Sequence, residues 1–440
     1  MSGVRVRTTE LAALGVTLPG FVRRGKVIAS LPSLGLLTIA GMTPPEHEVH
    51  YVEIDELPDL KTLPDFDLVA ISSLTASVYD AYKVADAYRS RGVSVVMGGL
   101  HVSSLPVEAM AHCDAVVVGG AERAWPQVVT DAQQGILRRR YDGALAGVFE
   151  PAQYARPRFD LIKGRSYNRA TIQTSRGCPR GCEFCAASPL ITSRFNQKPV
   201  RLVIEEIRSL RCDFPDPFIE FADDNTFLDK AWSREFLQAL IPEQLHWFSE
   251  TDASVADDPV LCDLIAKSGC RQLLIGFESP RAMDLVGMDP VGWKQRIAPQ
   301  MQRVVDALQS RGVSVNGCFI LGLDAHTVDV FPMIRDFVRA SGLAEVQLTV
   351  MTPFPGSRLY DRLLRDGRLL CETFWDRCTL FDVNYRPARM TLDELESGMR
   401  WLFTEVYSRD ATSQRQRSFV TARSNGRATS GARSVTTLTS

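Results

Sequence analysis

The first third of the chain alternates short runs of β-branched residues with segments of helical periodicity. Strand-like runs lie at 48–55, 67–75, 93–99 and 114–120, and helix-like segments lie at 78–92, 105–112 and 121–135. This alternation predicts a doubly wound, Rossmann-like parallel sheet. Each run after the first ends in Ser, Thr or Gly. Small residues would therefore gather at the carboxyl edge of the sheet, where open sheets bind ligands.

A second alternation begins after a proline-containing connector at 150–167. Its strand candidates lie at 170–175, 217–222, 246–251, 271–279, 313–322 and 344–352. Helical segments fall between them, for example at 202–211 and 293–312. Six β/α units are fewer than the eight of a closed barrel. We therefore expect an open, partial (β/α) barrel.

The two alternations predict an α/β protein of several parts. We expect a Rossmann-like domain over 1–149, a linker over 150–167, a partial barrel over 168–356, a mostly helical extension over 357–408 and a disordered tail over 409–440. The tail is rich in Ser, Thr, Arg and Gly. Too little of it can be buried to offset the entropy lost on ordering.

Composition narrows the class of protein. The chain carries 50 basic and 52 acidic side chains. It therefore has no net positive charge that would attract nucleic acid. An apolar run within 23–42 contains Pro32 and is shorter than the roughly 20 residues of a membrane span. We therefore expect core there and no span. Most of the ten cysteines stand singly in apolar runs, which is typical of reduced thiols in a cytoplasmic protein.

Three cysteines stand together in "SRGCPRGCEFCAAS" (175–188), with the spacing C-x3-C-x2-C at Cys178, Cys182 and Cys185. Thiolate clusters bind zinc or iron–sulfur clusters. Structural zinc takes four ligands, commonly in two pairs, and no second pair stands at matching spacing. A redox pair, "CEFC", with an incidental third thiol is a further interpretation. A 4Fe-4S cluster held by three cysteines would leave one iron open to a substrate.

This loop, placed after the first strand of a six-unit partial barrel, resembles that of the radical S-adenosylmethionine (radical SAM) enzymes. The resemblance covers residues 168–356 and implies a 4Fe-4S cluster whose open iron chelates S-adenosylmethionine and releases a 5′-deoxyadenosyl radical. It also implies contacts to S-adenosylmethionine from the residue before the third cysteine and from strand ends, at Phe184, Asp223, Thr251, Glu278 and Gly322.

Other roles for the strand-end residues stay open. Asp223, Asp224 and Asn225 could instead cap a helix. Glu278 could be a buried acid paired with a basic neighbour. A carboxylate at the carboxyl end of a barrel strand usually faces the site, so we favour the ligand role for Glu278.

The N-terminal loops resemble those of cobalamin-binding domains, in "SSLT" (72–75), "GGLH" (98–101) and "VVVGGAERAW" (116–125). The order of domains also resembles the cobalamin-binding radical SAM enzymes, of the class B methyltransferase type. The residues implied in cobalamin binding are Ser72, Leu74, Thr75, Gly98, Gly99, His101, Gly119, Gly120 and Glu122.

Two departures from the cobalamin pattern matter. The motif D-x-H-x-x-G, which supplies a histidine to cobalt in some of these domains, is absent, and an acid is often found where Gly120 stands. His101 could approach the cobalt, although a satisfied loop histidine is the other interpretation. A sheet that has lost its cofactor is the alternative for the whole domain.

The resemblance implies a methyltransferase acting on an unactivated carbon, and occasionally on phosphorus, of a small-molecule substrate. An electron donor such as flavodoxin or ferredoxin would reduce the cluster. Segments 352–370 and 381–399 resemble the C-terminal extension of one cobalamin-dependent subgroup.

A radical cyclase or other rearrangement enzyme without methyl transfer is an alternative. A corrinoid sensor or an iron–sulfur electron carrier is a third, although electron carriers usually ligate every iron.

Overall fold

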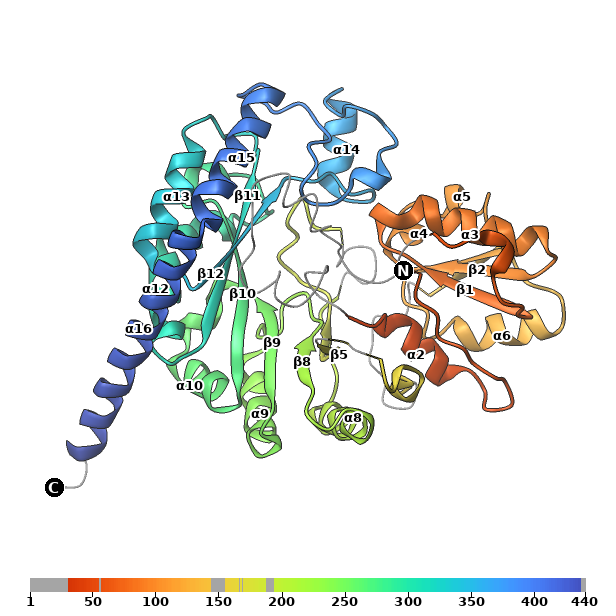
Figure 1. Cartoon of the computed structure of the whole chain (residues 1–440), viewed down its shortest axis with the longest axis horizontal. Coiled ribbons are helices and arrows are strands. Elements are labelled where there is room, and N and C mark those ends of the chain that lie inside the picture. The colour runs from red at the N-terminus through yellow and green to blue at the C-terminus, as the bar shows by residue number, and fades with distance from the viewer. Residues whose placement is uncertain are drawn as a thin grey trace. The chain divides into compact units, whose positions relative to one another are not determined.

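The computed structural model (Figure 1) describes residues 31–54, 57–143, 155–165, 167, 169–186 and 194–436, with side chains up to 426. These residues divide into two compact units. The first unit holds 31–215 together with 352–385, and the second holds 216–351 together with 386–436. The predicted domain boundaries at 149, 167, 356 and 408 follow a different division and stay predictions.

The first unit contains a parallel sheet in the order β1 (Leu68–Ser72), β2 (Ser94–Gly98), β3 (Ala115–Val118) and β4 (Arg140–Asp142). One face packs on α3 (Val78–Ser90), α4 (Leu100–Ser104) and α5 (Pro106–Ala109). The other face packs on α2 (Leu34–Met42) and α6 (Trp125–Gln133). Helices on both faces of a parallel sheet confirm the doubly wound prediction.

Two details of this sheet differ from the prediction. Residues 48–54 belong to no strand of the described sheet, and residue 55 lies outside the described residues. The hydroxyl of Tyr51 instead accepts a hydrogen bond from the Ser33 N–H and donates one to Glu53, so side chains hold this segment. Strand β4 was not predicted because two of its three residues are charged and show no apolar pattern.

The cysteine segment also belongs to the first unit. Strand β5 (Ala170–Ile172) precedes it, and the antiparallel pair β6 (Ser175–Arg176) and β7 (Asn196–Gln197) brackets it. Helix α8 (Val200–Asp213) follows. A buried ion pair between Lys198 Nζ and Glu206 Oε2, at 2.8 Å, fixes the segment between β7 and this helix.

The second unit contains the parallel strands β8 (Phe218–Phe221), β9 (His246–Thr251), β10 (Cys270–Glu278), β11 (Ser314–Leu321) and β12 (Glu345–Val350), hydrogen-bonded in sequence order. Its helices are α9 (Lys230–Leu240), α10 (Pro259–Lys267), α11 (Trp293–Ile297), α12 (Met301–Gln309) and α13 (Val330–Ser341). Within the described residues β12 pairs with β11 alone, so it is an edge strand and the sheet is open. With β5, all six predicted strands form.

Short 3-10 turns connect several of these elements. They are η2 (Leu60–Thr62), η3 (Thr75–Ser77), η5 (Phe159–Ile162), η6 (Ile241–Glu243), η7 (Ala253–Asp257), η8 (Ala282–Leu285), η9 (Ala298–Gln300) and η10 (Trp375–Arg377). Turn η9 divides the single helix predicted over 293–312 into α11 and α12. It contains Pro299, which lacks the N–H that an α-helix needs at that point.

The C-terminal region supplies helix α14 (Arg358–Arg365) to the first unit, and α15 (Leu392–Tyr407) and α16 (Arg409–Thr436) to the second. The prediction of a disordered tail is therefore wrong for residues 409–436, and residues 437–440 lie outside the described residues. Arg415 of α16 is only 5% exposed and its Nη1 donates to the Val406 carbonyl at 2.6 Å. Gly426 passes so close to the Ser310 carbonyl that a Cβ there would lie 1.9 Å from its oxygen.

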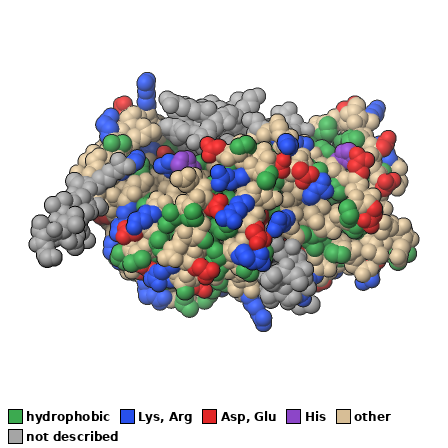
Figure 2. Space-filling view, turned by 90° about the horizontal axis from the view of Figure 1, so that it is seen from below, with side chains coloured by type: hydrophobic (Ala, Val, Ile, Leu, Met, Phe, Trp, Pro, Cys, Tyr) green, Lys and Arg blue, Asp and Glu red, His purple; other side chains and the backbone are tan. Residues whose placement is uncertain are grey.

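Acidic and basic side chains are interspersed over the face shown in Figure 2, as the near-even charge predicts. Several form exposed ion pairs, such as Arg311 with Asp263. Among the described helices, none is both long and apolar enough to cross a membrane.

Candidate functional site

The three cysteines of the C-x3-C-x2-C motif lie on one tightly curled loop. Cys178, Cys182 and Cys185 form no disulfide, and each is partly exposed. Gly177 and Gly181 have φ angles of 88° and 61°, which side-chain-bearing residues rarely adopt, so the glycines permit the two reversals of the loop. The Cys185 N–H donates to the Cys182 carbonyl at 3.2 Å and closes the last turn.

No three His, Cys, Asp or Glu side chains in the described ranges converge on a point that could hold a single metal ion. A 4Fe-4S cluster binds each cysteine through a different iron, so its thiolates do not share one centre. Three partly exposed thiols on one loop are a donor set that fits such a cluster. Phe184, between the second and third cysteines, is also partly exposed.

The predicted cobalamin residues Ser72, Gly98 and Gly99 come together at the carboxyl edge of the first sheet. Ser72 ends β1 and is in register with Gly98, which ends β2. A Cβ on Gly99 would lie 2.8 Å from Ser72 Oγ. The neighbouring Ser73 Oγ is buried and has no hydrogen-bond partner within the described part of the chain. A close-fitting edge with an unsatisfied hydroxyl fits a polar cofactor such as cobalamin.

Leu74 and Thr75 continue this edge, because Leu74 precedes η3 and Thr75 begins it. The loop after β3 supplies Gly119 and Gly120, and the Gly119 N–H donates to Ser103 Oγ at 2.9 Å. The structure thus places these four predicted residues on loops that follow β1 and β3.

Glu122, on the same loop, forms an ion pair with Arg176. Its Oε1 lies 2.6 Å from Nη2 of Arg176, a residue that stands two positions before Cys178. Burial raises the pKa of Glu122, but the Arg176 guanidinium outweighs this and holds the pKa below its ordinary value. The ionised carboxylate therefore links the β3 loop to the start of the cysteine loop.

His101 lies in α4 and is 1% exposed. Its Nε2 is 3.3 Å from Glu108 Oε1, and its ring packs edge-on against Trp375. Glu108 also accepts a hydrogen bond from Trp375 Nε1 at 3.0 Å. These contacts place His101 in the core of the first unit, but its buried Nδ1 has no hydrogen-bond partner among the described residues, so only one ring nitrogen is satisfied. Its predicted contact to cobalamin remains untested.

In the second unit, Asp223 and Thr251 join a buried polar network at the ends of β8 and β9. Asp223 accepts a hydrogen bond from Thr226 at 3.0 Å. Thr251 donates to Asn225 Oδ1 at 3.0 Å, and Asn225 donates to Asp252 at 2.9 Å. The alternative of a helix cap at 223–225 is wrong, because Asp229 caps α9.

Glu278 ends β10 and has a φ of 60°, an unusual value for a residue with a side chain, which costs roughly 1–3 kcal/mol. Its Oε1 lies 2.7 Å from Lys294 Nζ, and Lys294 also donates to the Gly276 carbonyl at 2.9 Å. The basic neighbour of the alternative interpretation is therefore present. Oε2 of Glu278 is buried and accepts no hydrogen bond from the described residues. That atom could receive the amine of S-adenosylmethionine.

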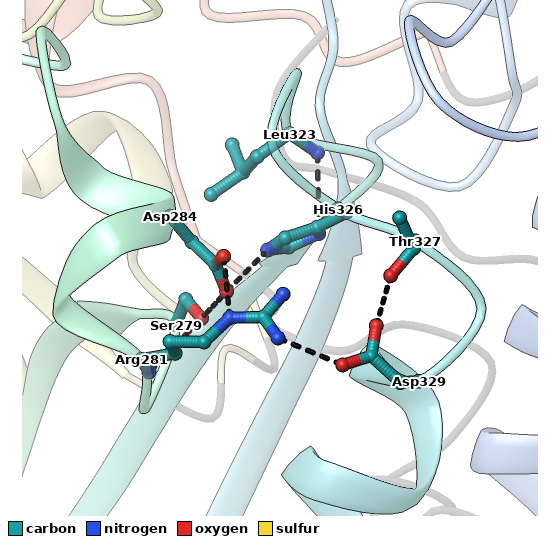
Figure 3. A network of polar contacts seen from close by, with 7 residues as sticks. All are labelled: Ser279, Arg281, Asp284, Leu323, His326, Thr327 and Asp329. Atoms are coloured by element: carbon teal, nitrogen blue, oxygen red, sulfur yellow. Dashed lines mark hydrogen bonds and ion pairs between the residues drawn. The ribbon is translucent and has the colours of Figure 1, made fainter.

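Gly322 follows β11 and leads into a loop that a second buried network holds (Figure 3). Asp284 accepts hydrogen bonds from Ser279 at 2.6 Å and from Arg281 Nε at 2.7 Å. His326 lies 3.4 Å from the same carboxylate, and its Nδ1 accepts the Leu323 N–H at 3.3 Å. The network ties the loops that follow β10 and β11 to each other.

Several supporting residues were not predicted. They are Arg176, Lys294, Asp284, His326 and, on α14, Arg358 and Arg362. Asp223 and Glu278 could be predicted because they stand at strand ends. No local pattern in the sequence indicates the supporting residues, because their partners lie far along the chain.

Comparison with known families gives three matches. The family described as B12 binding domain matches residues 22–129, the Radical SAM superfamily matches residues 172–338, and a domain of unknown function, DUF4070, matches residues 357–438. These ranges take in the cobalamin-type edge, the cysteine loop and the three C-terminal helices, respectively.

Two curated relatives are similar over most of their length. Bacteriochlorophyllide d C-8(2)-methyltransferase of Chlorobaculum tepidum is 26% identical over 86% of this chain and 85% of its own. An uncharacterized methyltransferase of Pyrococcus horikoshii is 28% identical over 86% of this chain and 88% of its own.

A solved structure shares the fold. The radical S-adenosylmethionine methyltransferase TsrM of Kitasatospora setae, with cobalamin and a 4Fe-4S cluster bound, has a TM-score of 0.57 and 17% identity over 78% of this chain and 75% of that chain. The chain thus matches both the B12 binding domain and the Radical SAM superfamily in one sequence. The two curated relatives to which it is similar are both named as methyltransferases.

Proposed function

We propose that this enzyme transfers a methyl group to an unactivated carbon of a small-molecule substrate. The observation that carries the proposal is the curled loop of three partly exposed thiols, held in the same unit as a sheet whose carboxyl edge fits cobalamin. The homology to methyltransferases supports the same reaction class.

Each cofactor has residues of this chain assigned to it. Cys178, Cys182 and Cys185 would hold a 4Fe-4S cluster, and the loops after β1, β2 and β3 would seat cobalamin. Phe184, Asp223, Thr251, Glu278 and Gly322 would contact S-adenosylmethionine. When bound, these groups supply a 5′-deoxyadenosyl radical and a transferable methyl group. In the second unit, Lys294 pairs with one carboxylate oxygen of Glu278. The other oxygen can accept a hydrogen bond from the ligand.

An electron donor such as flavodoxin or ferredoxin completes the proposal, because a cluster of this kind must be reduced before each turnover. We also place the enzyme in the cytoplasm. None of the ten cysteines forms a disulfide, which is typical of proteins in that reducing compartment.

Single cysteine variants test the assignment. We expect Cys178→Ala, Cys182→Ala and Cys185→Ala each to abolish formation of 5′-deoxyadenosine in an anaerobic assay with reductant and S-adenosylmethionine. Cys212→Ala is the matched control, because Cys212 is an exposed thiol on α8 outside the loop. Cleavage of S-adenosylmethionine by all three loop variants would overturn the assignment.

The products distinguish methyl transfer from the alternatives. An extract of the producing cell supplies the substrate, and the reaction is run with and without cobalamin. We expect 5′-deoxyadenosine and S-adenosylhomocysteine to rise together, and only with cobalamin. If 5′-deoxyadenosine rises alone, a cyclase or rearrangement replaces methyl transfer. A fully ligated cluster with spectra that S-adenosylmethionine does not change would indicate an electron carrier instead.

A further inference from the structure

The start of the domain of unknown function lies against the cysteine loop. Helix α14 makes three kinds of contact with residues 181–183, all within the first unit. Arg358 Nη2 donates to the Gly181 carbonyl, and the Leu359 N–H donates to the Glu183 carbonyl at 2.9 Å. Arg362 donates two hydrogen bonds to the Glu183 carboxylate, from Nε to Oε2 at 3.1 Å and from Nη2 to Oε1 at 2.8 Å.

These contacts fall inside the motif. Gly181 directly precedes Cys182, and Glu183 directly follows it. The Glu183 and Arg362 side chains are only 24% and 27% exposed. Paired, fork-like contacts between arginine and a carboxylate are stronger and more directional than single surface ion pairs. The geometry therefore restrains the loop at the cysteine in its middle.

Helix α14 is itself rigidly seated. Leu359 and Leu363 are fully buried, and the ring of Tyr360 lies 5.9 Å from that of Trp375. Trp375 belongs to the core that packs on α3, where its Nε1 donates to Glu108. A continuous set of packed residues thus runs from the core of the N-terminal sheet, through α14, to the cysteine loop.

We propose that Arg362, with Arg358, is a positioning residue for the iron–sulfur cluster, and that this is a function of the first helix of the DUF4070 region. The inference rests on the proposed binding of a cluster by Cys178, Cys182 and Cys185. The Arg362–Glu183 pair holds Cys182 in its ligating position and keeps the loop from opening.

The test measures the cluster itself rather than turnover. Full-length wild-type protein, Arg362→Gln, Glu183→Gln and the double variant are reconstituted anaerobically, and iron and sulfide are counted. The rate of cluster loss to an iron chelator and the electron paramagnetic resonance spectrum of the reduced cluster are then recorded. Arg365→Gln is the matched control, because Arg365 is exposed on the same helix.

We expect each single variant to lose its cluster about tenfold faster than wild type, with an altered spectrum of the reduced cluster. The double variant should lose it no faster than either single variant, because both substitutions remove one shared contact. Arg362→Lys, which keeps the charge but not the fork, should fall between wild type and Arg362→Gln. Arg365→Gln should behave as wild type.

The outcomes separate this inference from the proposed function. A wild-type protein that takes up no 4Fe-4S cluster overturns the proposed function. A wild-type cluster with unchanged loss rates and spectra in Arg362→Gln and Glu183→Gln overturns only the positioning role. If Arg362→Gln does not fold, Glu183→Gln decides the question alone, because it is nearly isosteric and changes only the loop side of the contact. Additive effects in the double variant would also overturn the inference.

Discussion

The carboxylate of Asp284 shows how a single buried residue can support the predicted ligand loops of the second unit. It gathers Ser279, Arg281 and His326 around its two oxygens (Figure 3). Burial raises the pKa of Asp284, but its hydrogen bonds outweigh burial and hold the pKa below the ordinary value. Ionised Asp284 therefore stabilises the fold at neutral pH, and this contribution is lost as the pH falls through its lowered pKa.

We expect Asp284→Asn to lower the free energy of unfolding by about 3 kcal/mol at pH 7, because it removes the buried charge that accepts hydrogen bonds from Ser279 and Arg281. Urea unfolding followed by circular dichroism measures this change. Asp336→Asn is the control: Asp336 is paired with Arg335 on the exposed side of α13 and should cost less than about 1 kcal/mol. Equal effects of the two substitutions would contradict the role given to the network.

Candidate residues differ in how far sequence alone could assign them. The three cysteines, the strand-end residues and the small residues of the first sheet each stand in short motifs that a reader can recognise. Arg362 and Lys294 have no such signal, because each acts through a partner that only folding brings near. The ion pair of Glu122 Oε1 with Arg176 had no signal in the sequence either, and the contact of Glu122 to cobalamin stays a prediction.

At the scale of elements, prediction succeeded where burial follows a simple period. Apart from the run at 48–55, the runs of β-branched residues became β1, β2, β3, β5 and the five strands from β8 to β12. Helix α16 shows the limit of that approach, because its mean composition is polar. It is ordered through a few specific contacts, chiefly those of Arg415 and Gly426, which composition does not reveal.

The docking of α16 has a measurable dependence on pH. Glu345 begins β12, and burial raises its pKa to about 7, although Arg415 of α16 opposes the rise. A carboxyl with a raised pKa contributes stability below its unfolded pKa and loses it as the pH rises through the folded pKa.

We therefore expect Glu345→Gln to leave stability near that of wild type at pH 4.5 and to exceed wild type by roughly 1–3 kcal/mol at pH 8.5. Urea unfolding at several pH values between these limits tests this expectation. A constant difference between variant and wild type across the range would show that Glu345 does not titrate with folding.

At the scale of the whole molecule, one unit carries the residues proposed for two cofactors. The cobalamin-type edge and the cysteine loop both belong to the first unit, whereas most predicted contacts to S-adenosylmethionine belong to the second. The residues proposed for the cluster and those proposed for cobalamin are different. Substitutions can therefore test the binding of each cofactor separately.

We expect Gly99→Ala to weaken cobalamin binding about tenfold or more while the iron content stays unchanged. The added Cβ would lie 2.8 Å from Ser72 Oγ on a backbone with a φ of 101°, which disfavours side chains. Titration with cobalamin, followed by absorbance, and an iron count measure both effects. Gly35→Ala on α2, where nothing lies within 4 Å of the new Cβ, is the control. Wild-type affinity in Gly99→Ala would show that this edge does not seat the cofactor.

The contact between Glu183 and Arg362 joins residues 179 positions apart. Synthesis proceeds from the N-terminus, so the cysteines leave the ribosome long before α14 does. The loop therefore acquires its full support only when most of the polypeptide has been made. We therefore expect iron and sulfide to be delivered to the three thiols only after α14 has been synthesised. On this arrangement, cluster assembly is a late step in the maturation of the enzyme.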